Sequence, residues 1–183
     1  MAQYARPDAD DTDGNWTDKS GGGTLYTSID ETSSDDATTY IKVTDNGSNE
    51  ACIVRLSDVS APGSSGTYIK YTALTSDNAY TGDPPDLKIE LLQGSSVKAT
   101  TTNSSVSTGS WTAYSFTISD VSGISDWTDL KFRITSIAGS GGGMGAGDEM
   151  KVSQVYLETQ DAGGGGSTPI AAIAMNTYRQ LSN

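Results

Sequence analysis

Short runs in which apolar and polar residues alternate recur along the middle of the chain. The clearest run places Leu87, Ile89 and Leu91 on one face of an extended segment and Lys88 and Glu90 on the other. The same period of two predicts further strands over residues 24–29, 38–44, 51–57, 67–74, 97–102, 111–118, 130–136 and 150–158. Short strands at regular intervals, separated by turn residues, predict an all-β protein, a two-sheet antiparallel jelly-roll sandwich.

Two of these runs depart from simple alternation. The run at 97–102 is polar, which predicts a strand at the edge of a sheet. The last run changes phase between Val152 and Val155, which predicts a β-bulge near Ser153 and Gln154. The inward-facing apolar positions predict a core that contains Ile41, Val54, Ile69, Ile89, Leu91, Phe116, Ile118, Phe132, Ile134 and Leu157.

The pattern divides the chain into four parts. Residues 1–23 are acidic and rich in turn residues, so we expect an N-terminal arm before a sandwich body over 24–160. Glycine dominates 161–168, which predicts a linker, and 139–147, which predicts a mobile loop. Residues 169–183 would form a short helix with an apolar stripe of Ile170, Ile173, Met175, Tyr178 and Leu181. We expect this stripe to bind a partner, because a free helix of this length is marginal in water; the alternative is that it folds back onto its own sandwich.

Composition then removes most classes of chemistry. The chain of 183 residues is 34% hydrophobic, has a formal net charge of −12, and contains no His and one Cys, Cys52. A Ser-His-Asp triad, a His-ligated metal, an internal disulfide and a thiolate zinc site are therefore excluded. The acidic balance argues against nucleic acid as a partner. No apolar run approaches the length of a membrane helix, and the first residues lack a secretory signal pattern, so we expect synthesis in a cytoplasm and no membrane partner.

The N-terminal arm holds a candidate calcium site. Asp11, Asp13 and Asn15 fall at the first, third and fifth positions of an EF-hand-like loop. Trp16 stands where that loop needs glycine and Gly22 where it needs a bidentate glutamate, so an EF-hand is not expected. A nonstandard Ca²⁺ site is the alternative to a solvated acidic arm, and no other cofactor is expected.

Paired carboxylates suggest glycoside hydrolysis, in which one carboxyl group acts as a general acid. The candidate pairs lie in polar, turn-like segments, where nothing evident would raise a pKa. Aspartates that cap their own turns are the simpler interpretation, so we expect no catalytic residue and no enzyme. The pairs are Asp35 with Asp36, Asp83 with Asp86, and Asp126 with Asp129.

Two tryptophans are candidates for sugar contact. Trp111 alternates with Ala113 and Ser115, opposite the face that carries Phe116, and it is the stronger candidate. Trp16, in the acidic arm, is the second. The alternative for both is that they fill a core that is short of aliphatic residues.

A resemblance to known proteins rests on several segments between residues 6 and 158. The segments Arg6-Pro-Asp8, Gly14-Asn-Trp-Thr17 and Ile29-Asp-Glu31 resemble the opening of tailed-phage virion proteins. The segments 111–117, 126–133 and 152–158 look like the closing strands of jelly rolls of the carbohydrate-binding-module type. The resemblance implies a virion structural role without catalytic residues.

Three functional hypotheses follow. The first is a phage capsid decoration protein, a homo-oligomer assembled in the host cytoplasm and bound to the major capsid protein at the virion surface through terminal segments. The second is a carbohydrate- or host-surface-binding module of a phage tail. The third is a subunit of a self-assembling extracellular filament or sheath.

Overall fold

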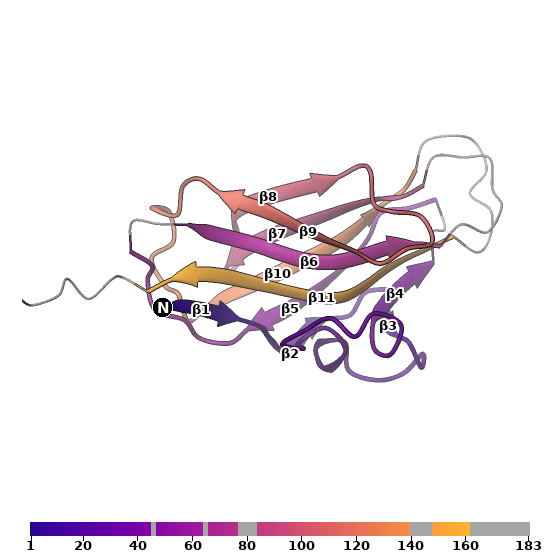
Figure 1. The fold of residues 1–183 in the computed structure, drawn as a ribbon, viewed down its shortest axis with the longest axis horizontal. Coiled ribbons are helices and arrows are strands. Elements are labelled where there is room, and N and C mark those ends of the chain that lie inside the picture. Colours follow the sequence, from indigo (N-terminus) through magenta and orange to yellow (C-terminus); the bar gives the residue numbers. More distant parts are fainter. Residues whose placement is uncertain (45–46, 64–65, 77–83, 140–147, 162–183) are drawn as a thin grey trace, which may run out of the picture.

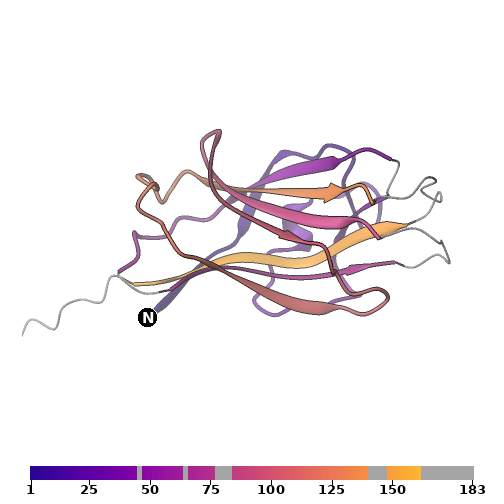
Figure 2. The same cartoon turned by 90° about the horizontal axis from the view of Figure 1, so that it is seen from above.

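Two antiparallel sheets pack face to face in the computed structural model, which describes residues 1–44, 47–63, 66–76, 84–139 and 148–161 (Figures 1 and 2). The elements are β1 (Ala2–Ala5), β2 (Pro7–Thr12), β3 (Thr17–Asp18), the 3₁₀ helix η1 (Tyr26–Ser28), β4 (Ile41–Thr44), β5 (Glu50–Leu56), β6 (Thr67–Thr75), β7 (Asp86–Gln93), β8 (Ser96–Asn103), β9 (Thr112–Ile118), β10 (Leu130–Ile137) and β11 (Glu149–Gln160). The predicted all-β sandwich is confirmed. Within the described part of the chain, no helix is long and apolar enough to cross a membrane.

The long strand β11 organises the six-stranded sheet, whose order is β3-β4-β11-β6-β9. One side of β11 pairs with β6, and the other side pairs with β4 at its start and β1 at its end. In the interval between β4 and β1, the N–H of Val155 donates to the carbonyl of Ile29 at 3.2 Å. The register with β6 shifts between Val152 and Gln154, so the predicted bulge is confirmed.

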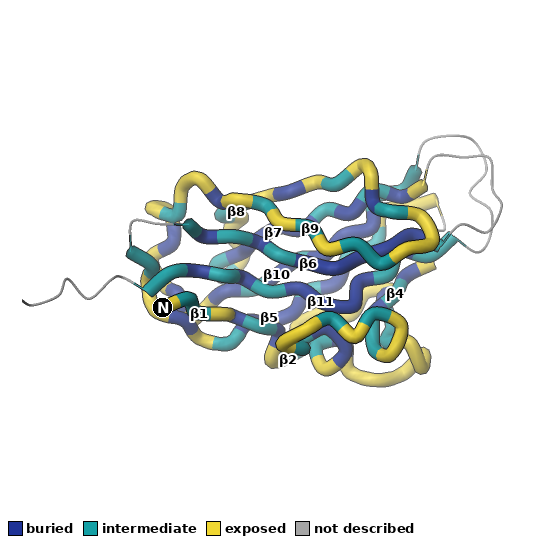
Figure 3. The backbone as a smooth tube through the Cα atoms, in the orientation of Figure 1, coloured by how far each residue is buried: buried dark blue, intermediate teal, exposed yellow. Residues whose placement is uncertain are grey.

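The second sheet has five strands in the order β2-β5-β10-β7-β8. The polar strand β8 lies at its edge, as predicted. Buried and partly buried residues alternate along much of β6, β10 and β11 (Figure 3). Every predicted core residue is buried except Phe116, which packs against the core but stays partly exposed on the edge strand β9.

The first 23 residues do not form a separate arm, which corrects the prediction. β1 pairs with β11 in one sheet and β2 pairs with β5 in the other, and Ala5 at the end of β1 is fully buried. These strands add mainly backbone hydrogen bonds at two sheet edges. Their small and acidic side chains therefore leave no hydrophobic period for sequence reasoning to detect.

The predicted strand at 24–29 is instead a turn around η1. The Asp10 carboxylate accepts hydrogen bonds from the N–H groups of Leu25 and Tyr26, both at 2.8 Å. Leu25 and Ile29, four residues apart, both reach the core from this single turn. The linker 161–168, apart from Asp161, and the segment 169–183 lie outside the described residues, as does most of the glycine-rich loop 139–147.

Candidate functional site

A hollow of about 330 Å³ lies on the outer face of the six-stranded sheet, the face turned toward the viewer in Figure 1. The side chains that point outward around it come from β11, β6 and β9 in two cross-strand rows: Tyr156, Lys70 and Ser115, and then Gln154, Thr72 and Ala113. We call these six residues the hollow. They bring together segments of the chain that are far apart in sequence.

Small side chains create the depression. Ala113 and Ser115 on β9 are both exposed and too short to fill the space between their larger neighbours. Gln154 is held in place, since its amide donates to the carbonyl of Glu31 at 2.7 Å. Lys70 forms an ion pair with Glu158 at 2.5 Å, and this hydrogen bond raises the pKa of the lysine. The exposed hydroxyl of Ser115 and the paired ammonium of Lys70 therefore flank Thr72 and Gln154, which are only 5% and 7% exposed.

Aromatic rings border one end of the hollow. Tyr156 meets Tyr4 edge to face, with ring centroids 5.9 Å apart, and Tyr4 is 47% exposed. The guanidinium carbon of Arg6 lies 4.9 Å from the centroid of the Tyr156 ring and 5.5 Å from that of Tyr4. The guanidinium also donates to the carbonyl of Glu31, which fixes it beside the rings. This end is thus a cation-backed aromatic surface.

A second aromatic pair lies beyond the other end. The rings of Tyr40 and Trp111 are 5.6 Å apart and tilted by 52°. Lys151 and Lys19 approach the Tyr40 ring to 5.6 and 5.8 Å. Leu74 lies on the same outer face, directly opposite Lys151, yet it is only 8% exposed and does not belong to the core cluster. The outer face is therefore partly covered at this end of the sheet, where Leu74 is shielded from solvent.

The two predicted sugar contacts have different positions. Trp111 lies on the outer face and is partly exposed, next to Ala113 and Ser115 as the alternation predicts. Trp16 is only 2% exposed, and its indole N–H donates to the carbonyl of Glu50 at 3.0 Å. Trp16 anchors the N-terminal segment to β5 and presents no ring to solvent, so its assignment as a sugar contact is wrong.

The candidate calcium residues are engaged by different partners. The Asp11 carboxylate accepts from Lys131 at 3.2 Å and from Arg55 at 3.4 Å, and these partners, Lys131 first, lower its pKa. The Asn15 amide donates to Glu50 at 2.7 Å. Asp13 uses its carbonyl to accept from the N–H of Trp16 at 3.1 Å. Among the described residues, no group of three or more acidic or cysteine side chains is placed to hold a metal ion, so the structure gives no support to the alternative of a nonstandard Ca²⁺ site.

Two of the candidate carboxylates, Asp126 and Asp35, act as turn caps. Asp126 accepts from the hydroxyl of Thr128 at 2.7 Å and from its N–H at 2.9 Å, and both bonds lower the aspartate pKa. Asp35 accepts from the N–H of Thr39 at 3.0 Å. A lowered pKa is the wrong direction for a general acid at neutral pH. Asp83 lies outside the described residues.

A second hollow, of about 310 Å³, lies near the start of β10 and the end of β5. Its charged lining mixes three carboxylates with two cations: Asp8, Asp58, Asp129, Arg55 and Lys131. No aromatic side chain lines it. It therefore differs chemically from the hollow on the six-stranded sheet.

No protein-family model matches the sequence, and no curated protein matches it. Among solved structures, the chain is similar to the C-terminal CBM6 of LamC, a marine laminarinase from Zobellia galactanivorans, with 14% identity over 87% of this chain and 100% of that chain, at a TM-score of 0.46. It is also similar to the CBM22-1 xylan-binding domain of Xyn10C from Paenibacillus barcinonensis, with 13% identity over 88% and 94% of the two chains and a TM-score of 0.44.

A third similar structure is tailspike protein 4 of bacteriophage CBA120, with 8% identity and a TM-score of 0.42. The match covers 86% of this chain but 19% of the tailspike chain. At these identities the likeness concerns the fold alone. The chain's own two antiparallel sheets define its class, a jelly-roll β-sandwich, and its function has to be argued from its own surface.

Proposed function

We propose that the protein is a glycan-binding module and that the hollow on the outer face of the six-stranded sheet is its site. The observation that carries the proposal is the combination of an open depression, an aromatic ring at its border and convergent polar groups. Tyr156 supplies the ring, and Gln154, Thr72 and Ser115 supply amide and hydroxyl groups. Small-molecule sites combine apolar surface with a few placed polar groups in this way.

The chemistry of a sugar suits such a surface. A sugar ring has an apolar C–H face and a rim of hydroxyl groups, so it needs an aromatic face and hydrogen-bonding groups close together. Tyrosine provides both an apolar body and a polar tip. The rigid strands hold the groups in place before the ligand arrives, which limits the entropy lost on binding.

We further propose that binding proceeds without turnover. Two of the carboxylates that sequence analysis considered for hydrolysis, Asp35 and Asp126, cap turns, and the lining of the hollow contains no carboxylate. A module of this kind would hold its protein, or the particle that carries it, on a polysaccharide surface. Attachment to a phage capsid through residues 168–183 is a separate proposal that rests on the sequence alone, and deleting that segment and measuring particle binding tests it.

The glycan-binding proposal is tested by affinity electrophoresis of the full chain in gels that contain neutral or anionic polysaccharides. The variant Ala113→Trp fills the hollow from an exposed strand position without touching the core. Its matched control is Thr102→Trp, an exposed position opposite Lys88 on the five-stranded sheet.

We expect at least one polysaccharide to retard the natural protein, and Ala113→Trp to weaken that binding at least about tenfold, or roughly 1.4 kcal/mol. Thr102→Trp should bind like the natural protein. Failure of every polysaccharide to retard the natural protein, or equal binding by Ala113→Trp, would overturn the proposal.

A further inference from the structure

Cationic side chains gather around the hollow although the whole chain has a net charge of −12. Arg6 lies against Tyr156 at one end, and Lys19 lies against Tyr40 at the other. Neither forms an ion pair with any described residue; Lys19 instead donates to the carbonyl of Ala37 at 2.6 Å. Two uncompensated positive charges therefore border this face.

A third positive charge remains because two lysines share one carboxylate. Lys42 and Lys151 lie directly opposite each other on β4 and β11, and both contact Glu149, at 2.8 and 2.9 Å. Lys70 has one carboxylate partner, Glu158. The outer face of the six-stranded sheet thus sets five cations against two carboxylates, those of Glu149 and Glu158: the cations are Arg6, Lys19, Lys42, Lys70 and Lys151.

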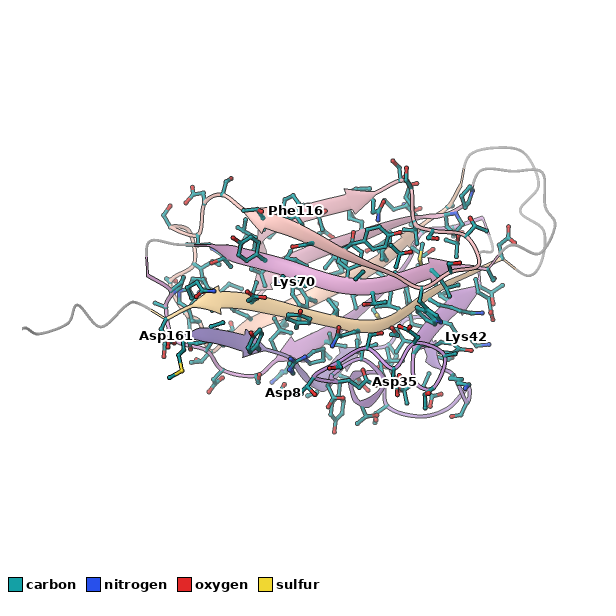
Figure 4. The ribbon with its side chains drawn as sticks, viewed as in Figure 1. Asp8, Asp35, Lys42, Lys70, Phe116 and Asp161 are labelled. Atoms are coloured by element: carbon teal, nitrogen blue, oxygen red, sulfur yellow. The ribbon has the colours of Figure 1, made fainter. Side chains whose placement is uncertain are left out.

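Acidic residues do occur nearby, but at the margin. Asp30, Glu31, Asp35 and Asp36 belong to the loop before β4, and Glu31 and Asp35 both accept from the Thr39 hydroxyl. Figure 4 shows Asp35 in this loop, beside the sheet, and Lys70 in the middle of the face between β6 and β11. The positive excess therefore borders the hollow: Arg6 and Lys19 donate to carbonyls of this loop, and Lys42 and Lys151 share Glu149 beyond it.

The second hollow gives the contrast that identifies the ligand. There, two cations are outnumbered by three carboxylates, whereas the lining of the first hollow holds Lys70 and no carboxylate. Opposite charge attracts a ligand and excludes one of like charge, so complementarity gives specificity. A cationic face adds nothing to the solubility of an acidic protein. A negatively charged ligand therefore explains why these cations lie together on one face.

We propose that the ligand is an anionic polysaccharide, a glycan that carries carboxylate or sulfate groups. Its sugar rings lie over the hollow beside Tyr156, and its negative groups lie near Lys70, Arg6 and Lys151. This inference rests on the proposed function and names its substrate class. The site is a surface of spaced charges with no closed pocket, so it suits a chain of repeated anionic sugars better than a single small anion.

The test compares three soluble polymers by isothermal titration with the full chain: polygalacturonate for carboxylate, dextran sulfate for sulfate, and neutral dextran. We expect at least one anionic polymer to bind at least about tenfold more tightly than dextran, and more weakly as NaCl rises from 20 to 500 mM, because salt screens exposed charges. Binding of polygalacturonate alone assigns a carboxylate ligand, and binding of dextran sulfate alone assigns a sulfate ligand.

Charge-removing variants locate the interaction. Arg6→Gln and Lys151→Gln should each weaken anionic binding by about three- to fivefold, in the range of an exposed ion pair. Arg6→Lys should restore part of the loss. Lys98→Gln is the matched control, because Lys98, like Arg6, forms no ion pair within the described chain but lies on β8 of the other sheet, where it donates to the carbonyl of Gly123.

The outcomes separate this inference from the proposed function. Equal or tighter binding of a neutral polymer, with sensitivity to Ala113→Trp, would overturn the anionic ligand and leave the glycan-binding site in place. Anionic binding that Ala113→Trp leaves unchanged, or that Lys98→Gln weakens as much as Lys151→Gln does, would place the interaction elsewhere and overturn the inference. Binding of no polymer would overturn both.

Discussion

The two sheets of this sandwich share one core but present different outer faces. The six-stranded sheet has an open hollow with small side chains in the middle, aromatic rings beyond both ends and more cations than carboxylates. The five-stranded sheet carries a charged network in which Glu90 contacts Arg133 at 2.6 Å and Lys88 at 3.3 Å. Arg55 and Lys131, two further cations of this sheet, share Asp11 and lie among further carboxylates.

The outer face of the five-stranded sheet stabilises the sheet itself, whereas the outer face of the six-stranded sheet is free to bind a ligand. Interleaved charges on β7 and β10 satisfy one another and leave a polar, solvated face. On the other sheet, Ala113 and Ser115 are too short to cover their neighbours and Tyr4 stays exposed, so the face keeps unused contact area. The outer face of the six-stranded sheet therefore keeps both contact area and placed polar groups that a ligand can use.

The largest expected effect comes from the core beneath both faces. Ile89 on β7 is fully buried, and Ile89→Ala should lower the free energy of unfolding by about 2–5 kcal/mol through lost burial and a cavity. Urea unfolding followed by circular dichroism and by tryptophan fluorescence should give one coincident transition, because both sheets pack on the same core.

An exposed position on the same sheet provides the control for Ile89→Ala. Val97 is 46% exposed, so Val97→Ala should change stability by less than about 0.5 kcal/mol. Separate transitions for the two probes would mean that the two faces belong to independently stable sheets, and the comparison would then have to be abandoned.

A smaller effect is expected at the turn that borders the hollow. Asp10 accepts from two N–H groups at the start of η1, and Asp10→Ala should lower the unfolding free energy by about 1–2 kcal/mol, as for a lost cap. Chemical denaturation measures the change. Asp13→Ala is the control, since the contact of Asp13 in the structure is made by its carbonyl; an equal loss in both variants would show that general charge, and not the cap, is responsible.

The smallest effect is a difference in how stability depends on pH between two carboxylates: Glu31, beside the six-stranded sheet, and Glu90, on the five-stranded sheet. Burial raises the pKa of Glu31, whose Oε2 is buried without a hydrogen-bond partner, although Thr39 donates to the other oxygen. The hydrogen bond from Arg133 lowers the pKa of Glu90. The unfolded value for both is about 4.3.

The signs of the two contributions are opposite. A raised folded-state pKa means that Glu31 favours folding most below the unfolded pKa, and this stability is lost as pH rises through the folded pKa. A lowered folded-state pKa means that Glu90 stabilises the fold above the unfolded pKa, and this stability is lost as pH falls through the folded pKa.

Urea unfolding between pH 3 and pH 7 measures both contributions against the natural protein. The natural protein should lose stability relative to Glu31→Gln as pH rises, and gain stability relative to Glu90→Gln over the same range. Two difference curves with the same slope would contradict the opposite environments assigned to these carboxylates.

Sequence reasoning determined the fold class because the pattern of buried and exposed positions in a strand is visible within a few consecutive residues. A period of two located β5, β6, β7, β8, β10 and β11, and a one-residue phase change located the bulge at Ser153. The same alternation placed Trp111 on the outer face with Ala113 and Ser115. These features depend on neighbours within a few residues, so a single strand carries enough information to predict them.

Only the tertiary structure decided which parts of the chain meet. Tyr156, Lys70 and Ser115 form one row of the hollow because of the register between three strands, and register is not visible in any one of them. The sequence left Trp16 open between sugar contact and core filling, and the pairing of β1 and β2 with two sheets decides for the core, where its ring is 2% exposed. Backbone pairing at a sheet edge needs little help from side chains, and so it leaves little trace in the sequence.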